Sequence, residues 1–446
     1  MTKDLTEGKP IVLIFKFVIP LVLGNLFQQL YNIIDATIVG KTLGINALSA
    51  VGASTSVNFL ILGFCTGSCV GLAIPIAREF GAKNYSRMRI LIANCYYLGL
   101  IYACIITFFT SILCDYILNR MKTPDIIYQD AYTYQLIIFL GIPFVILYNL
   151  LASIIRALGD SKIPFYFLVL STFCNILLDL FCIKILHLGV AGAGLATIFA
   201  QGMAGIGCLI YISGHYDILK YKSGEKKLII KECLHLLSYS IPMGLQTSIT
   251  AIGSIMLQTA VNSLGSLEVA GYAAALKIKG VFICPFDAIG SGVATFISQN
   301  IGAGKYDRIK KGIASGLAIG LIWSMFTIIM LLLFTDNIAR IFVKSEEVSV
   351  LQLVNQFMHA SSIFYPALAF LGAYRYAVQG VGYSKTALCS GVVEMVARAS
   401  MSLFVIPVYR FNAVIFTDQT AWVSAALYSM IAFYIIFNID VKKRMI

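Results

Sequence analysis

Charged residues, histidine and tryptophan are scarce in this sequence. Asp, Glu, Lys and Arg make up 12% of its 446 residues, whereas soluble domains carry about 25%. There are only four His and two Trp, and none of the 11 Cys forms a CxxC pair or a Cys/His ligand spacing. This composition excludes an ordinary soluble protein, and no residues have the arrangement of a metal site or an enzyme's catalytic set. We expect the cysteines to be small buried hydrophobic residues.

Long apolar runs take the place of the missing charge. Hydrophobic residues make up 59% of the chain, and its mean hydropathy is +0.86. A helix crosses a bilayer in about 20 residues, at about 1.5 Å of rise per residue. The runs therefore predict an all-α polytopic membrane protein with twelve transmembrane helices. The predicted spans are 11–40, 48–77, 89–115, 128–157, 163–186, 191–213, 233–262, 270–298, 312–336, 350–379, 386–409 and 418–440.

The net charge of +12 would suit a nucleic-acid partner, but its distribution indicates membrane topology instead. Of the 33 Lys and Arg residues, 23 fall at the termini or in the even-numbered loops. This count assigns Arg375 and Lys385 to one such loop, and Lys442, Lys443 and Arg444 to the C-terminus. Cytoplasmic loops carry an excess of Lys and Arg. We therefore expect both termini in the cytoplasm and no binding of nucleic acid.

The sequence repeats itself once. The loop GAKNYSRMR at 81–89 matches GAGKYDRIK at 302–310, and the same offset of 221 pairs Gly71 with Gly292. Further along, Pro143 and GDSK (159–162) match Pro366 and GYSK (382–385) at an offset of 223. An internal repeat of this length indicates two copies of one structural unit.

We predict from this repeat an N-terminal lobe at 1–214, a cytoplasmic linker at 215–231 and a C-terminal lobe at 232–446. Each lobe has six helices, so both insert into the membrane in the same orientation. In transporters with parallel repeats, the substrate site lies between the halves and alternates its exposure. The repeat therefore favours a transporter.

An acidic residue stands inside the first apolar run, FQQLYNIIDATIVGK (27–41), at Asp35. Counting along the predicted helices, Asn175, Asp179 and Thr197 arrive at a similar depth in the outer half of the membrane. Ionised carboxylates in a membrane are costly and face the protein interior, partnered or protonated. These four oxygen-bearing side chains could hold Na⁺ or a proton. The alternative is a buried polar network that only bridges the helices.

The second half carries a different set of charges. Glu394 and Arg398 stand four residues apart in the eleventh predicted helix, where they could neutralise each other and hold the packing, or contact substrate. Asp287 lies midway along the eighth helix, and Lys277 and Lys279 lie earlier in it. The role of the two lysines stays open.

The chain resembles the multidrug and toxic compound extrusion family over nearly its whole length. The resemblance rests on several stretches in order: FQQLYNIIDATIVGK, LSAVGAS (48–54), the two GA-rich loops, RALGDSKIPF (156–165), NILLDLFCIK with GVAGAGLAT (175–197), and VEMVARASM (393–401). It implies twelve helices in two lobes around a central cleft, and export of organic, often cationic compounds in exchange for Na⁺ or H⁺. A likeness to the bacterial branch of the DNA-damage-inducible F protein follows because the seventh helix lacks the family's second cation-site glutamate.

The resemblance also implies roles for individual residues. Asp35 stands where the family's first-helix aspartate binds the coupling ion, and Asn175, Asp179 and Thr197 match the rest of that site. Residues that we expect in the substrate cleft are Gln28, Tyr31, Phe286, Asp287, Glu394 and Arg398.

The implied protein needs no cofactor beyond its coupling ion. We expect a functional monomer in a bacterial cytoplasmic membrane that takes organic cations and drugs as substrates. The alternative function is a flippase for a lipid-linked or amphipathic precursor. Such an anionic substrate would call for uncompensated basic residues along the cleft, and Lys277 and Lys279 are the only candidates.

Overall fold

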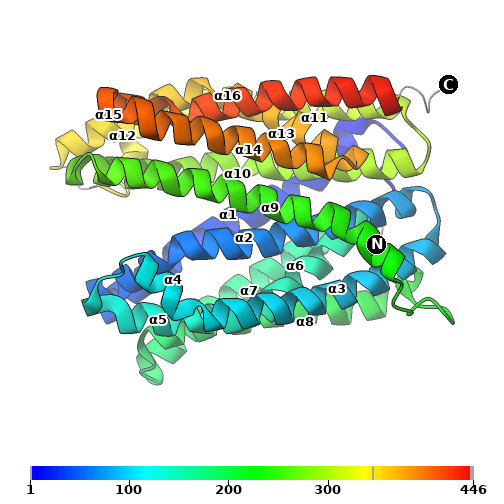
Figure 1. The fold of residues 1–446 in the computed structure, drawn as a ribbon, viewed down its shortest axis with the longest axis horizontal. Coiled ribbons are helices and arrows are strands. Elements are labelled where there is room, and N and C mark those ends of the chain that lie inside the picture. Colours follow the sequence, from blue (N-terminus) through cyan, green and yellow to red (C-terminus); the bar gives the residue numbers. More distant parts are fainter. Residues whose placement is uncertain (1–2, 344–345, 442–446) are drawn as a thin grey trace. The chain divides into compact units, whose positions relative to one another are not determined.

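The computed structural model describes residues 3–343 and 346–441, and these residues form helices and loops without a strand (Figure 1). The α-helices are α1 Pro10–Leu43, α2 Ile45–Gly81, α3 Tyr85–Ile112, α4 Cys114–Arg120, α5 Asp125–Leu140, α6 Ile142–Ala157, α7 Lys162–Leu180, α8 Gly189–His215, α9 Ile230–Asn262, α10 Ser266–Gly302, α11 Asp307–Ala339, α12 Val348–Ile363, α13 Tyr365–Val381, α14 Ser384–Ser400, α15 Ile406–Tyr409 and α16 Phe411–Ile436. The short segments are the π-helices η1 Phe181–Ile185, η3 Met401–Val405 and η4 Phe437–Val441, and the 3-10 helix η2 Asp217–Leu219.

Each of the twelve predicted spans contains a helix or a pair of helices. In the described ranges, nine helices are long and apolar enough to cross a membrane alone, and α5 with α6 forms a further span bent by 44°. The pair α12 and α13 also meets at a break, at Phe364. Both α6 and α13 carry proline in the first turn, where the missing N–H costs nothing. Pro143 and Pro366 therefore begin a new helix, whereas Pro20, Pro242 and Pro285 lie inside α1, α9 and α10.

The internal repeat is visible in the helix bounds. Both α2 and α10 have 37 residues, and their ends differ by the predicted offset of 221. A five-residue π-helix follows α7 in the first half and α14 in the second. The all-α fold with two related sets of helices is thus confirmed.

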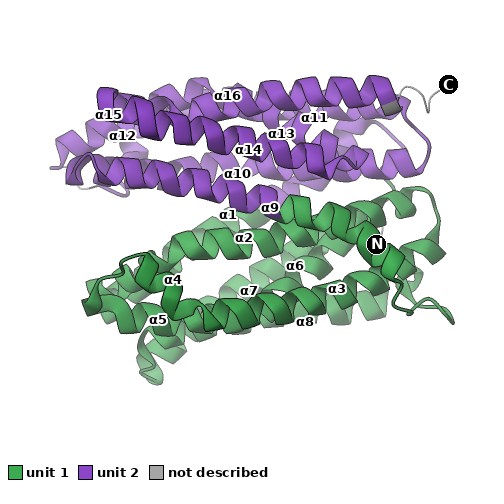
Figure 2. Cartoon of the chain, in the orientation of Figure 1, with its two compact units in different colours: residues 1–4, 23–244 green, residues 5–22, 245–446 purple. Residues whose placement is uncertain are grey.

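The chain forms two compact units (Figure 2). Unit 1 contains the residues up to Asp4 and Leu23–Gly244, and unit 2 contains Leu5–Val22 and the residues from Leu245 onward. The chain therefore changes unit in the middle of α1 and of α9, each time two residues after a proline, Pro20 or Pro242. The first half of α1 thus belongs to unit 2, and the first half of α9 belongs to unit 1. The lobes predicted at 1–214 and 232–446 do not contain this exchange of half-helices and stay a prediction about the repeat.

Two glycines related by the repeat make room for the exchanged half-helices. In unit 1, a Cβ added to Gly71 would lie 2.7 Å from the Cα of Ser240, on the first half of α9. In unit 2, a Cβ added to Gly292 would lie 2.7 Å from Cγ2 of Val18, on the first half of α1. A side chain at Gly71 would therefore require the backbone of α9 to shift, whereas one at Gly292 would require the side chain of Val18 to move.

The segments that precede α1 and α9 are fixed by different groups. In unit 1, Glu225 accepts hydrogen bonds from Arg89 Nε at 2.6 Å and Nη2 at 2.7 Å, and from Ser86 Oγ at 2.8 Å. The Arg89 side chain, with the Lys222 amide and Ser86, lowers the pKa of Glu225 to about 2.

In unit 2, backbone carbonyls take the place of that acid. Lys305 donates to the Thr6 carbonyl at 3.0 Å, Arg308 to the Gly8 carbonyl at 2.9 Å, and Asn300 to the Leu5 carbonyl at 3.2 Å. The basic residues of the second GA-rich loop therefore hold this segment through its backbone carbonyls.

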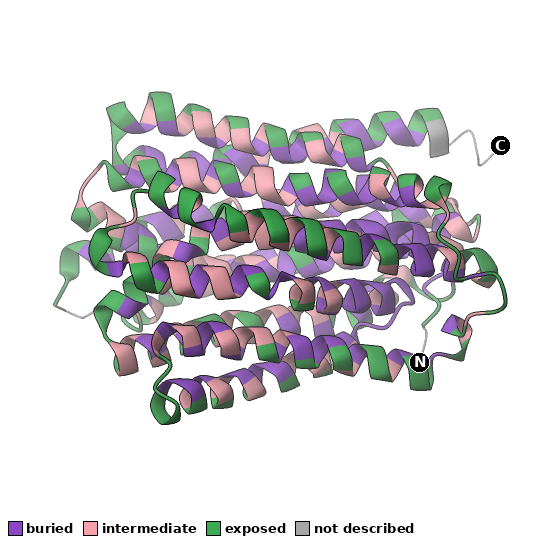
Figure 3. Ribbon diagram, turned by 60° about the horizontal axis from the view of Figure 1, so that its bottom comes forward, coloured by how far each residue is buried: buried purple, intermediate pink, exposed green. Residues whose placement is uncertain are grey.

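Exposed residues recur along the helices (Figure 3), and many of them are large and apolar. Leu100, Phe108, Ile210 and Leu333 are each at least 60% exposed. Apolar exposure on this scale is unusual for a soluble monomer and is expected for helices in contact with lipid.

Candidate functional site

Three helices of unit 1 carry the residues predicted to bind the coupling ion. Asp35 lies on α1, Asn175 and Asp179 on α7, and Thr197 on α8. Asn175 and Asp179 are one turn apart, so both project from one face of α7. Helices α7 and α8 pack together along their length.

The two carboxyl groups face each other in a buried position. Asp35 is 8% exposed and Asp179 is fully buried, and their carboxyl groups lie close enough to interact electrostatically. Among the described residues, Oδ1 of Asp35 and both carboxyl oxygens of Asp179 have no hydrogen-bond donor. The side-chain amide of Asn175 is likewise unpaired and buried. Two adjacent carboxylates cannot both stay ionised at this depth unless a proton or a cation lies with them.

Two tyrosines complete the polar surroundings. The Tyr31 hydroxyl, on α1, is 2.9 Å from Oγ1 of Thr197 and can donate to it or accept from it. Tyr134, on α5, lies close enough to both carboxyl groups to interact with them electrostatically. Tyr31 was predicted as a cleft residue, whereas Tyr134 was not predicted at all. The sequence gives no signal for Tyr134, because α5 has no acidic residue at the depth of Asp35 and Asp179.

Apolar side chains pack beside the carboxyl pair. Val39, Ile183, Val190 and Ala193 form one buried cluster with Tyr134. The π-helix η1 begins two residues after Asp179, and π-helical segments occur frequently at functional sites. Dry walls of this kind strengthen any interaction between the carboxylates and a bound cation.

The chemistry of the donor set limits the ion. Within the described ranges, no three His, Cys, Asp or Glu side chains lie close enough to hold a metal ion together. The site offers two carboxyl groups, one amide, one hydroxyl and phenol oxygens, which are hard ligands. This set fits a proton or an alkali cation better than a transition metal.

Unit 2 carries a chain of paired charges instead. Arg398 donates to Glu394 at 2.8 Å, as predicted, and also to Asp418 at 2.8 Å. Glu394 accepts from Arg375 at 2.5 Å, and Asp418 accepts from Lys279. All five side chains are buried or nearly so.

Two charges in this network differ from the sequence-based expectation. Arg375 lies within α13 rather than in a cytoplasmic loop, so its assignment there was wrong. The reason is that its charge is neutralised by Glu394, a contact between helices that the one-dimensional pattern does not contain. Asp418 was not singled out, since it stands at the edge of the last predicted span. Lys442, Lys443 and Arg444, also counted for topology, lie outside the described residues.

The predicted cleft residues are divided between the units. Gln28 is exposed on α1 and Tyr31 is partly exposed, both in unit 1. In unit 2, Asp287 is exposed in the middle of α10. Phe286 is only 4% exposed and stacks on Tyr365, at 6.0 Å between ring centroids.

Known proteins share this sequence pattern and fold. The MatE family matches residues 20–181 and 242–404. The probable multidrug resistance protein YoeA of Bacillus subtilis is 28% identical over 342 residues, which cover 74% of this chain and 73% of that one. The multidrug export protein MepA of Staphylococcus haemolyticus is 24% identical over 382 residues, which cover 84% of each chain.

Solved structures agree with the fold. A MATE protein crystallised in complex with MaL6 superposes with a TM-score of 0.91 at 20% identity, covering 99% of this chain and 100% of that one. A MOP superfamily transporter from Pyrococcus furiosus superposes with a TM-score of 0.90 at 20% identity, covering 99% of each chain. This likeness extends over both units and supports the twelve-helix fold.

Proposed function

Because the chain belongs to the MatE family of multidrug and toxic compound extrusion transporters, we propose that it exports organic, mostly cationic and amphipathic compounds in exchange for H⁺ or Na⁺. The chain is a membrane transporter of this multidrug family rather than an enzyme. The direction of exchange, the coupling ion and the alternating access of two lobes belong to the proposal.

The observation that carries the proposal is the unpaired carboxyl pair of Asp35 and Asp179. A structural role would be expected to provide these buried oxygens with donors, as Asp418 has in unit 2. The pair instead offers acceptor oxygens alone, which is the requirement for binding a proton or Na⁺ reversibly.

Coupling requires that the ion binds two conformations with different affinity. Asp35 and Asp179 lie on different helices, so a movement of α1 against α7 changes the distance between the carboxyl groups. An ion held by both carboxyl groups favours the conformation in which they are close. In the proposed cycle this ion enters from outside, α1 rearranges near Pro20, and substrate leaves outward.

Charge supports a cationic substrate. Asp287 presents an exposed carboxylate in the middle of a membrane-spanning helix of unit 2. An exposed acid at that depth suits a positively charged compound. Gln28 presents an exposed amide in unit 1 and could orient the same compound.

The flippase alternative lacks the basic residues that it requires. Lys279 is paired with Asp418, and Lys277 lies over the ring of Phe342 at 5.8 Å from its centroid. The charge of Lys279 is therefore neutralised, whereas the ring contact leaves the charge of Lys277 in place, so one of the two lysines rather than both would face an anionic substrate. The charges favour efflux of cations over transport of an anionic lipid precursor.

Orientation and assembly complete the proposal. The excess of Lys and Arg supports cytoplasmic termini in a bacterial plasma membrane, and relatives such as YoeA and MepA come from bacteria. We expect the monomer to be the functional form because each unit holds its own site residues.

Transport in proteoliposomes tests the proposal. Vesicles are loaded with a fluorescent organic cation, and an inward gradient of Na⁺ or of H⁺ is imposed separately. The wild-type protein should release the dye with one of the gradients, and Asp35→Asn and Asp179→Asn should abolish that release. Asp336→Asn is the matched control, because this half-exposed acid of α11 pairs with the half-exposed Arg340 and with Asn355, which all belong to unit 2, whereas the carboxyl pair belongs to unit 1. Wild-type rates in the Asp35 and Asp179 variants would refute the assignment.

A further inference from the structure

An open pocket lies at one end of unit 1, where α1 ends and where the chain turns from η1 into α8. Its volume is about 470 Å³. The residues that line it are Thr42, Leu43, Ile183, Lys184, His187 and Gly189. In the orientation proposed above, this end of the helices faces the outside of the cell, because α1 starts at the cytoplasmic side and ends here.

Three helical segments connect this pocket with the ion site, each in two steps of four residues. From the pocket inward, the residues are Leu43, Val39 and Asp35 on α1, then His187, Ile183 and Asp179 on the turn, η1 and α7, and finally Gly189, Ala193 and Thr197 on α8. Residues four apart lie on one face of a helix. The outermost residue of each series lines the pocket, and the innermost belongs to the predicted ion site. The middle residues therefore form a layer between the two.

This middle layer is apolar and buried. Val39 and Ala193 are fully buried, and Ile183 is 3% exposed. All three belong to one cluster with Tyr134, which lies close enough to both carboxyl groups to interact with them. Ile183 also lines the pocket, and Leu43, a further lining residue, packs against the same cluster. The floor of the pocket is thus the outer side of the cluster that packs beside the carboxyl pair.

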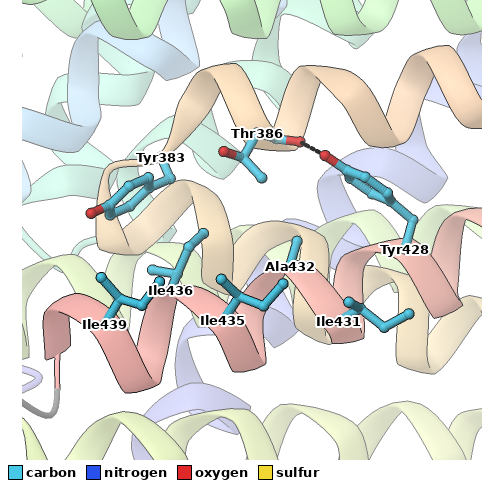
Figure 4. A pocket seen from close by; sticks show the side chains of 8 residues that line it. All are labelled: Tyr383, Thr386, Tyr428, Ile431, Ala432, Ile435, Ile436 and Ile439. Atoms are coloured by element: carbon cyan, nitrogen blue, oxygen red, sulfur yellow. Dashed lines mark hydrogen bonds between the residues drawn. The ribbon is translucent and has the colours of Figure 1, made fainter.

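A pocket of unit 2 has no such layering (Figure 4). It lies between α14 and α16, has a volume of about 360 Å³ and is lined mainly by isoleucine and tyrosine side chains. The Tyr428 hydroxyl donates to the Thr386 carbonyl within it. None of its described lining residues is charged, and none belongs to the buried charge network around Arg398. The series of residues that ends on acids therefore distinguishes the pocket of unit 1.

The charge of the unit 1 pocket does not suit a bound organic cation. Lys184 is an exposed lining residue, and none of the described lining residues is acidic. A bound organic cation would need an acidic partner there. A passing proton or small ion needs none, since salt screens an exposed charge within about 8 Å at physiological ionic strength. The pocket is therefore suited to passage of an ion rather than to binding of a drug.

We propose that this pocket is the outer entrance of the ion path, and that Val39, Ile183 and Ala193 form an apolar gate between it and the carboxyl pair. A hydrophobic constriction blocks ions by excluding water, and it conducts once a small movement admits water. Ile183 lies in the π-helix η1, so a return of this turn to α-helical hydrogen bonding would rotate Ile183 relative to Val39. The role of the gate in coupling rests on the proposed function, whereas its exclusion of water does not.

Water access to the gate tests this inference. Purified full-length protein is exposed to hydroxyl radicals generated from water by X-ray radiolysis, and oxidation of Val39 and Tyr134 is followed by mass spectrometry. We expect Ile183→Ala to raise both oxidation rates about ten-fold over the wild type, because the layer loses much of its apolar bulk. Ile183→Leu, which conserves the volume, should behave like the wild type. The matched control is Ile185→Ala, because Ile185 is exposed on the same π-helix.

The outcomes separate the gate from the proposed antiport. Unchanged oxidation in folded Ile183→Ala, or an equal rise in Ile185→Ala, would overturn the gate even if Asp35→Asn abolishes efflux. Faster oxidation in Ile183→Ala alone would support the gate even if Asp35→Asn pumps at the wild-type rate, which refutes only the antiport. Where Ile183→Ala does not fold, Val39→Ala opens the same layer from α1, and a wild-type oxidation rate of Tyr134 in that variant would overturn the proposal.

Discussion

Units 1 and 2 use buried charge in opposite ways. Among the described residues, unit 1 keeps two carboxyl groups together and leaves three of their four oxygens without a donor, whereas unit 2 pairs every acid of its buried network with a base. Both arrangements stand on copies of one repeat, in helices that precede a π-helix, α7 and α14. A shared backbone therefore fixes where side chains meet, and the residue types decide whether the acids there are paired with bases or left without donors.

The segments before α1 and α9 also differ between the units: here unit 1 uses a paired acid, and unit 2 uses basic side chains bound to carbonyls. The segment before α9 is held in unit 1 by the carboxylate of Glu225, and the segment before α1 is held in unit 2 by basic side chains on backbone carbonyls. Among the hydrogen bonds named here, the first attachment ends on a carboxylate and the second on backbone carbonyls, which do not titrate. The attachment of the segment before α9 should therefore depend on pH more strongly than the attachment of the segment before α1.

The largest expected effect separates the acids of the two units by stability. Asp418→Asn leaves Arg398 and Lys279 without a full counter-charge in a buried position, so it should cost about 3–5 kcal/mol of unfolding free energy. Asp179→Asn removes one of two mutually repelling groups, so it should leave stability unchanged or raise it while transport is lost. Thermal unfolding in detergent measures both. A loss of stability in Asp179→Asn as large as that in Asp418→Asn would contradict the contrast.

The second-largest effect is expected for Glu225, whose carboxylate holds the loop before α9. Glu225→Gln keeps the shape of the side chain but leaves the buried Arg89 charge unpaired, which should weaken docking of the loop by about 2–3 kcal/mol. The measurement is the rate of trypsin cleavage at Lys226 and Lys227 at neutral pH. Asp217→Asn is the control, because its pair with Lys220 is exposed and contributes little. Equal protection of the loop in Glu225→Gln and wild type would show that the ion pair does not hold it.

Acid should release the same loop in the wild-type protein. Because the pKa of Glu225 is lowered in the folded state to about 2, its stabilisation is complete above the usual carboxyl pKa of about 4.3 and is lost as pH falls toward 2. Pepsin cleavage within residues 220–229 should therefore rise between pH 4.5 and pH 2. Cleavage within residues 5–9 should rise less, since the hydrogen bonds named above for Leu5, Thr6 and Gly8 are accepted by their backbone carbonyls from Asn300, Lys305 and Arg308.

The glycines at the exchanged half-helices should differ by a smaller amount. A methyl group at Gly71 meets the backbone of Tyr239 and Ser240, which cannot rotate away, whereas one at Gly292 meets the side chain of Val18. Gly71→Ala should therefore destabilise unit 1 by about 1–3 kcal/mol, and Gly292→Ala should cost less. Thermal unfolding of the two variants ranks them. The reverse order would show that the first half of α9 is held less firmly than that of α1.

The smallest effect concerns the tyrosine at the ion site. Tyr31→Phe removes the hydroxyl that faces Thr197, a loss of about 1 kcal/mol. Ion affinity should fall by less than about ten-fold, so ion-driven efflux should persist at a higher ion concentration. The concentration of Na⁺ or H⁺ that gives half-maximal efflux measures this shift. Complete loss of efflux would contradict this prediction, because Tyr31 would then be as necessary for efflux as Asp35 and Asp179.

The sequence by itself determined the membrane class, the twelve-helix fold, the repeat and the acids of the first half that the structure brings together. Each follows from properties that a linear pattern contains: length and hydropathy of apolar runs, fixed offsets, and acids at a shared depth. The stretch around Asp35 stood out because an acid is costly inside an apolar helix. The pair of Glu394 and Arg398 could be predicted for a similar reason, since residues four apart meet on a helix.

Only the tertiary structure decided which charges find partners and which half-helices change units. Arg375, Asp418 and Lys279 come from three different helices, so their network is a product of packing and not of spacing along the chain. Tyr134 reaches the ion site in the same way. The first half of α9 lies close to Gly71, and the first half of α1 lies close to Gly292. The sequence shows these two glycines, but only the tertiary structure shows which helix each of them contacts.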